Sequence, residues 1–359
     1  MKINLDSKEI SKINDILKAK QYNIVAAELY IDYLENHYND IKNIKTTYID
    51  EFLDCLEIDK EDKEFKELDN ANKISDIKEL DINEYKNNPY YKNIKFLNHK
   101  EKDWQLANLY YSKYEGFVYD ELDIDNKTYA EHTPIGYFKD KFIYPAVIQN
   151  DTIWMSVTPH EINTMKDSLN VIKDNVLVVG LGLGYYAYMA SIKDEVKKIT
   201  IIEKDKNVIE LFNKFILPQF KNKIEIINID AYKYFKNNKE LDYQYCFFDI
   251  YHNVQDGEEL YLKMKSMENL HKNIRYHYWI EDSILAMLRR QILTLFVEEY
   301  QGSKDIDYQK EENPNDRIIN KLHFLLKEKE ISSYEDLRIL ISRDNLRKIA
   351  KDINYQSLF

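Results

Sequence analysis

The sequence predicts an α/β protein built around an open, doubly wound parallel sheet, with helical extensions at both ends. Three observations predict this fold. Short apolar segments alternate with helical segments between residues 158 and 300. Three of the seven glycines, Gly180, Gly182 and Gly184, lie within five residues, directly after the first apolar segment. Each of the next three apolar segments ends at an acidic residue. This repetition is typical of strands whose carboxyl ends form a site.

The first part of the chain, residues 1–130, is polar and is expected to be mostly helical. Asp6 and Glu9 form a capping-box pattern, which favours the start of a helix. Apolar residues then recur at helical spacing, as Ile10, Ile13 and Leu17 do. We therefore expect a helix that begins near the N-terminus and a region that is mostly helical.

Residues 131–157 differ in composition and predict a β-hairpin that leads into the core. Aromatic and β-branched residues form two runs, and Asn150-Asp151 lies between them as a turn. Thr158 is a good helix N-cap, Pro159 suits the first helical position, and Glu161 completes a capping box. A helix is therefore expected over about 159–170.

The core, residues 158–300, is expected to hold five parallel strands with helices between them. Continuous apolar runs such as VLVV and YCFF are typical of strands that are covered on both faces. The C-terminal extension, residues 301–359, is expected to be helical, with no further strand pair. The five predicted strands are 176–179, 198–202, 224–229, 243–248 and 275–280.

Composition excludes several classes of protein. The formal net charge of the 359 residues is −12, which argues against nucleic-acid binding through a basic surface. No apolar run approaches the length of about 20 residues that a membrane span needs, and the polar N-terminus does not resemble a signal peptide. The two cysteines, Cys55 and Cys246, lie far apart and form no metal-binding pattern. We expect a cytoplasmic protein with a small-molecule substrate and no metal, and the sequence is compatible with a homodimer.

The ends of the first four core strands carry the residues that point to chemistry. Glycines allow a tight turn and the close approach of a ligand to the backbone, and the helix that follows favours an anionic group. Glu203 lies 23 residues after Gly180, where a carboxylate can accept both hydroxyls of a ribose. Asp230 can accept a hydrogen bond from an adenine amine, although it can equally cap the next helix. Asp249 would face the reactive part of the bound molecule.

The glycine turn separates two kinds of nucleoside site. Tyr185 stands where the dinucleotide fingerprint G-x-G-x-x-G has its third glycine, so an NAD-dependent oxidoreductase is disfavoured. The pattern G-x-G-x-G with acidic residues after strands two and three resembles that of class I S-adenosylmethionine-dependent methyltransferases, whose sheet is Rossmann-like.

Within that superfamily, four segments over roughly residues 140–285 resemble the spermidine-synthase branch. Val178 agrees with this branch, which lacks an acidic residue two positions before the first glycine. The resemblance implies S-adenosylmethionine, or its decarboxylated form, as cofactor or substrate. It implies cofactor contacts from Gly180, Gly182, Gly184, Glu203, Asp230 and Ala231. The segments are NVLVVGLGLGYY, ITIIEKDKNVIELF, IEIINIDAYKYF and YQYCFFDIYHN.

Three departures from the polyamine synthases favour methyl transfer over aminopropyl transfer. Leu183 and His252 stand where those enzymes carry Asp, and Met155 stands where they carry Gln. The catalytic candidates are Asp249, His252 and Tyr251; a histidine there can act as a general base. The alternatives are an aminopropyltransferase and a non-catalytic protein that binds a nucleoside or another protein.

Overall fold

A computed structural model describes residues 2–37, 59, 61, 77–101, 103–222, 224–302 and 314–353. Its centre is a five-stranded sheet in the order β13-β12-β11-β14-β15, and every neighbouring pair is parallel. The predicted fold class is confirmed, and so are the five predicted strands. Their bounds are β11 (Asp174–Val179), β12 (Val196–Glu203), β13 (Glu225–Asn228), β14 (Tyr245–Phe248) and β15 (Arg275–Tyr278).

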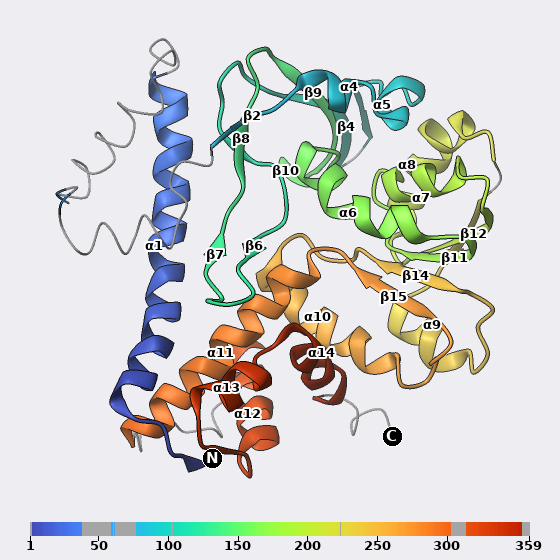
Figure 1. Ribbon diagram of the computed structural model, residues 1–359. Coiled ribbons are helices and arrows are strands. Elements are labelled where there is room, and N and C mark those ends of the chain that lie inside the picture. The colour runs from blue at the N-terminus through green and yellow to red at the C-terminus, as the bar shows by residue number, and fades with distance from the viewer. Residues whose placement is uncertain are drawn as a thin grey trace.

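Helices cover both faces of this sheet (Figure 1), which is why its central strands are apolar throughout. All four residues of β14 are buried, and so are the last four of β11. From β11 the chain runs to one edge through β12 and β13, and then returns to the other side as β14. The carboxyl ends of β11 and β14 therefore form the switch point of the sheet. The connecting helices are α7 (Tyr185–Ser191), α8 (Lys206–Phe215), α9 (Ala231–Asn237) and α10 (Val254–Met267), with the 3₁₀ turn η2 (Leu217–Gln219).

The first helix, α1 (Ser7–His37), begins as predicted. The amide of Glu9 donates to Oδ1 of Asp6 at 2.9 Å, and the amide of Asp6 donates to Oε2 of Glu9 at 3.1 Å. These reciprocal bonds form the expected capping box. Figure 1 shows α1 as a long rod at the side of the molecule, where it packs against α11 (Glu281–Gln301).

The expectation of a mostly helical region up to residue 130 is wrong for the described residues 77–130. Only α4 (Ile82–Lys86) and α5 (Pro89–Asn93) are helical there. Strand β4 (Trp104–Tyr111) pairs residue for residue with β9 (Phe142–Gln149), so its partner lies more than thirty residues away. A strand that forms through such a distant partner leaves little signal in its own local sequence. Cys55 lies outside the described residues. The strands are β2 (Lys78–Glu79), β3 (His99–Glu101), β4 (Trp104–Tyr111), β5 (Phe117–Val118) and β6 (Asp123–Ile124).

The predicted hairpin is confirmed as β9 and β10 (Thr152–Ser156), which pair antiparallel. Both turn residues, Asn150 and Asp151, have positive φ, at 49° and 61°. This conformation suits the right-handed twist of a two-residue hairpin, and Asn and Asp tolerate it well. The preceding strands are β7 (Glu131–His132) and β8 (Ile135–Tyr137), and helix α6 (Pro159–Val171) follows the hairpin.

Helices dominate the C-terminal extension, as expected, but one strand pair was missed. The two-residue strand β16 (Glu330–Ile331) pairs in parallel with β1 (Lys2–Ile3), at the opposite end of the sequence. So short a pairing across the chain has no local signal. None of the described helices has an apolar stretch long enough to cross a membrane. The helices after α11 are α12 (Pro314–Leu326), α13 (Tyr334–Leu340) and α14 (Arg343–Asp352).

Candidate functional site

The glycine turn brings the ends of β11 and β14 into contact. Gly180 has a φ of +100°, and a Cβ at this position would lie 1.7 Å from the carbonyl oxygen of Asp249. Gly184 has a φ of +73°, and its Cβ would lie 2.4 Å from the ring of Phe212. Only glycine fits at either position. The expected need for backbone freedom in this turn is therefore met by its geometry.

Glu203 ends β12 and turns back toward the glycine turn. Its Oε2 accepts a hydrogen bond from the amide of Leu181 at 3.1 Å, and its Oε1 accepts one from the amide of Asp205 at 2.7 Å. The side chain is half-buried. Each carboxylate oxygen has more than one lone pair, so both can still accept a hydrogen bond from a hydroxyl group.

Asp230 takes the role of a helix cap. Its Oδ1 accepts a hydrogen bond from the amide of Lys233 at 3.0 Å, and the side chain is exposed at the start of α9. Ala231 is the first residue of that helix. A contact with adenine stays a prediction for both residues, because neither one lines the cavity beside the turn.

A cavity of about 200 Å³ lies on the other side of the glycine turn, toward β14. The hairpin covers it: Met155 places its sulfur 3.5 Å from the position a Cβ of Gly182 would take. Glu203 does not line this cavity, so the turn separates the carboxylate from the enclosed space. The polar and aromatic lining comes from five segments, with Trp154, Glu161, Tyr185, Asp249, Tyr251, His252 and Trp279 among them.

Two acidic side chains, Glu161 and Asp249, line this cavity. Burial raises the pKa of Asp249, and the negative charge of Glu203 raises it further. Burial also raises the pKa of Glu161 well above its usual range, and Asp249 adds to this shift. We conclude that the pair carries less than two negative charges at neutral pH.

The capping-box role expected of Glu161 is wrong. Its amide does donate to Oγ1 of Thr158 at 3.5 Å, so Thr158 is the N-cap of α6. The carboxyl group, however, lies in the cavity beside Asp249 instead of returning to the cap. The sequence T-P-H-E predicts the start of a helix, and nothing in it indicates that the carboxyl group of Glu161 lies in the cavity.

His252 stands at the cavity with its imidazole held by Asp256. Nδ1 of His252 and Oδ2 of Asp256 are 2.8 Å apart, and Asp256 also accepts the amides of His252 and Asn253. The ring packs edge-on against Trp154, with centroids 4.4 Å apart. Burial works to raise the pKa of Asp256, but the hydrogen bonds from His252 and Asn253 lower it. The carboxylate favours a proton on Nδ1, which leaves Nε2 as the basic nitrogen.

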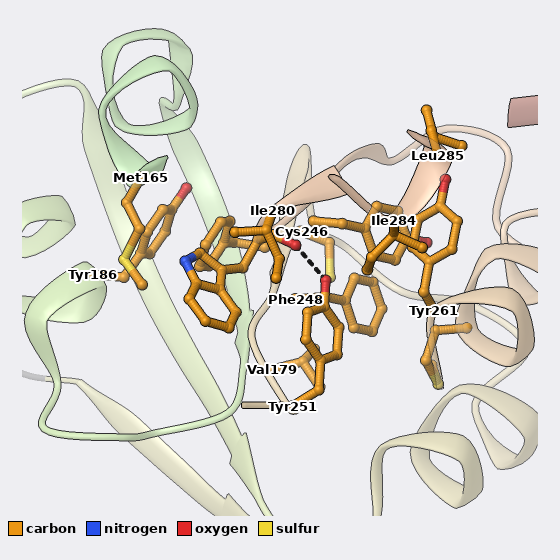
Figure 2. Close-up of a cluster of buried hydrophobic side chains, with 14 of the residues drawn as sticks. Met165, Val179, Tyr186, Cys246, Phe248, Tyr251, Tyr261, Ile280, Ile284 and Leu285 are labelled. Atoms are coloured by element: carbon orange, nitrogen blue, oxygen red, sulfur yellow. Dashed lines mark hydrogen bonds between the residues drawn. The ribbon is translucent and has the colours of Figure 1, made fainter. Parts of the chain in front are cut away.

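Tyr251 is committed to the backbone. Its hydroxyl donates to the carbonyl oxygen of Trp279, as the dashed line in Figure 2 shows. Burial raises the pKa of this phenol well above its usual range, so it stays protonated. His160 is also buried, beside Trp279, and burial lowers its pKa to about 4. It is therefore neutral at physiological pH.

Sequence reasoning missed two residues of this cavity, Glu161 and Trp154. Asp256 was expected only as an acidic group that could serve an aminopropyltransferase, whereas the structure pairs it with His252. Trp154 had no signal beyond its place in the hairpin.

Part of this chain is similar to solved structures. The structure is similar to that of spermidine synthase from Thermotoga maritima. The identity is 15% and the TM-score 0.29, over 42% of this chain and 59% of that one. It is also similar to MNMC2 from Aquifex aeolicus, with 17% identity and a TM-score of 0.27, over 43% of this chain and 60% of that one. The matches thus span about three fifths of each of those chains.

Both TM-scores lie below 0.5, so these likenesses carry no conclusion about this chain. No family model matches the sequence, and no curated protein matches it either. Within the described residues, no three His, Cys, Asp or Glu side chains converge as a metal site would require.

Proposed function

We propose that this protein is an S-adenosylmethionine-dependent methyltransferase that acts on a small polar molecule or a protein side chain. One observation carries the proposal: the glycine turn lies between a strand-end carboxylate, Glu203, and a cavity that contains Asp249. A nucleoside on the β12 side and a reactive group on the β14 side match these two halves.

Each half has a distinct role in the proposal. Glu203 accepts the ribose hydroxyls, and Asp230 takes the adenine amine with the oxygen that does not cap α9. The cavity of about 200 Å³ is too small for the whole donor and receives its sulfonium end. The indole of Trp154 and the carboxyl groups of Asp249 and Glu161 offer a cation an attractive environment there.

The reaction needs positioning and a base. The acceptor heteroatom attacks the methyl carbon in line, the bond from sulfur to that carbon breaks, and S-adenosylhomocysteine leaves with the electron pair. The proton of the acceptor passes to Nε2 of His252 or to the carboxylate of Asp249. Tyr251 has no part in proton transfer, because its hydroxyl is bonded to the carbonyl of Trp279.

Calorimetric titration of the intact chain with S-adenosylmethionine tests the proposal. We expect binding that weakens roughly tenfold or more in Glu203→Gln, since a hydrogen bond to a charged group is lost. Glu210→Gln, on the exposed surface of α8, is the matched control. The side-chain amide group of Gln at position 203 would face the backbone N–H of Leu181 or Asp205, which could lower the stability of the variant. The free energy of unfolding is therefore measured in parallel. The absence of binding by the wild-type chain at sub-millimolar ligand would refute the proposal.

A second function, aminopropyl transfer, is favoured by one observation. Glu161 joins Asp249 in the cavity, so two carboxyl groups stand where a cationic amine acceptor needs them. An assay with decarboxylated donor and putrescine decides between the two reactions. Turnover in this assay, with none from the ordinary donor, would replace methyl transfer by aminopropyl transfer. A non-catalytic binding protein would instead keep its biological activity in both Asp249→Ala and His252→Ala.

A further inference from the structure

A second and larger cavity, of about 530 Å³, lies where the β-rich N-terminal region meets the core. Its walls come from segments far apart in the sequence, which include residues 119–123, 132–135, 163–168 and 277–282, and from two arginines of α14. Its volume falls within the range of small-molecule sites. The transfer reaction proposed above does not use this cavity.

A wall one side chain thick separates the two cavities. Phe247 lines both of them. Trp279 lines the smaller cavity, and its Nε1 donates to Oγ1 of Thr164, which lines the larger one, at 2.9 Å. Ile280 follows Trp279 with a φ of 45° and ψ of 38°, an unusual conformation for a β-branched residue. Around this bend the chain sends Trp279 to one cavity and Glu281 to the other.

Two of the carboxylates in the larger cavity are already neutralised. Glu281 pairs with Arg347, and also with Lys265 at 3.0 Å. Asp282 forms a bidentate pair with Arg343, in which Nη2 and Oδ2 are 2.9 Å apart. These pairs account for both arginines that line the cavity.

Three further carboxylates line the same cavity without a cation. Asp120, Glu121 and Asp167 form no ion pair with any side chain that the structure describes. Oε1 of Glu121 accepts the amide of Ser283 at 2.9 Å, and Asp120 accepts the amide of Glu121 at 2.8 Å. Burial raises the pKa of Glu121 to about 7, and the charge of Asp282 adds to the shift. A positive charge placed here would therefore relieve an existing electrostatic cost.

We propose that this cavity binds a small organic molecule that carries an ammonium or guanidinium group. The carboxylates of Asp120, Glu121 and Asp167 take the charged group, and Tyr119, Ile135 and Phe247 pack against the carbon skeleton. An organic cation fits better than a metal ion, because no described trio of carboxylates converges on one point. The site is independent of the donor site and of the reaction proposed for it.

Calorimetric titration of the full chain with 1,4-diaminobutane tests this inference, with 1,4-butanediol as the uncharged analogue. We expect saturable binding of the diamine and none of the diol. The double variant Glu121→Gln/Asp167→Asn should weaken binding roughly tenfold or more. Gln at position 121 keeps an acceptor oxygen for the amide of Ser283. Asp140→Asn, on the exposed loop before β9, is the control for overall charge.

Asp249→Asn separates the two cavities in the same experiment. The inference predicts that this variant binds the diamine as the wild-type chain does. Diamine binding that is lost in Asp249→Asn but unchanged in Glu121→Gln/Asp167→Asn would place the cation in the donor cavity and overturn the inference. Absence of saturable binding, or equal weakening in Asp140→Asn, would overturn it as well. S-adenosylmethionine is titrated into the same proteins, so loss of the donor proposal is distinguishable from loss of this one.

Discussion

Gly180→Ala should disrupt the point at which the glycine turn meets β14. The added methyl group would lie 1.7 Å from the carbonyl oxygen of Asp249, about half of a normal contact distance. The backbone of both strand ends must move to make room, which costs about 1–3 kcal/mol as in other overpacked sites. The φ of +100° adds about 1–2 kcal/mol for a residue with a Cβ. We expect a loss of about 2–5 kcal/mol in the free energy of unfolding.

Gly182→Ala is the matched control, two residues along the same turn. Its φ of +53° carries a similar backbone cost, but the new methyl group would meet only the sulfur of Met155, at 3.5 Å. This is an ordinary contact, so we expect a loss of about 1–2 kcal/mol. Urea denaturation at equilibrium measures both values. Equal losses in the two variants, or a smaller loss in Gly180→Ala, would refute the close approach of Gly180 to Asp249.

Three further predictions concern charged groups. In Asp256→Asn, turnover should fall roughly tenfold or more with KM little changed, because His252 loses the carboxylate that orients it. A thermal melt checks that the fold of this variant is intact. Binding of S-adenosylmethionine should release protons from the acidic pair of Asp249 and Glu161, because a nearby sulfonium lowers the raised pKa values of these carboxyl groups. Calorimetric titrations in buffers of different ionisation enthalpy measure this release, and binding heats that do not depend on the buffer would contradict it. Burial alone would raise the pKa of Glu281, but Lys265 and Arg347 lower this pKa to about 2. About 3 kcal/mol of stability is therefore present above the ordinary glutamate pKa of 4.5 and is lost as the pH falls toward 2, and Glu281→Gln should lack this loss in urea titrations across that range.

The core of the fold could be predicted because its signals are local. Each strand of the central sheet is a short apolar run, and each connecting helix carries its own period or cap. Strand β4 had no such signal. Its sequence WQLANLYY becomes a strand through pairing with β9, and the same is true of the two-residue pair β1 and β16. A local stretch of sequence does not contain the partner strand, so it cannot predict such long-range pairing.

The part of the site at the strand ends could be predicted, but the side chains that cover the cavity could not. Gly180 follows β11 directly and Glu203 is the last residue of β12, so the geometry of a parallel sheet fixes where they lie. Glu161 comes from a helix that precedes the sheet, and its position depends on how α6 packs against α7. The sequence around it predicts a helix start correctly, but a backbone cap does not determine the direction of a side chain three residues later.

The charges around the two cavities suggest how an acidic chain with a net charge of −12 can keep buried carboxyl groups. In the smaller cavity the pKa values of Glu161 and Asp249 are raised, because burial disfavours both charged forms, Asp249 repels Glu161, and Glu203 repels Asp249. In the larger one, Glu281 stays ionised because fixed cations surround it. Glu121 forms no ion pair with the side chains that the structure describes. Its charged neighbour Asp282 is already paired with Arg343, and its Oε1 accepts a hydrogen bond from the neutral amide of Ser283. A buried acid left between these two solutions is stabilised most directly by a mobile cation, which is the physical reason to expect a ligand there.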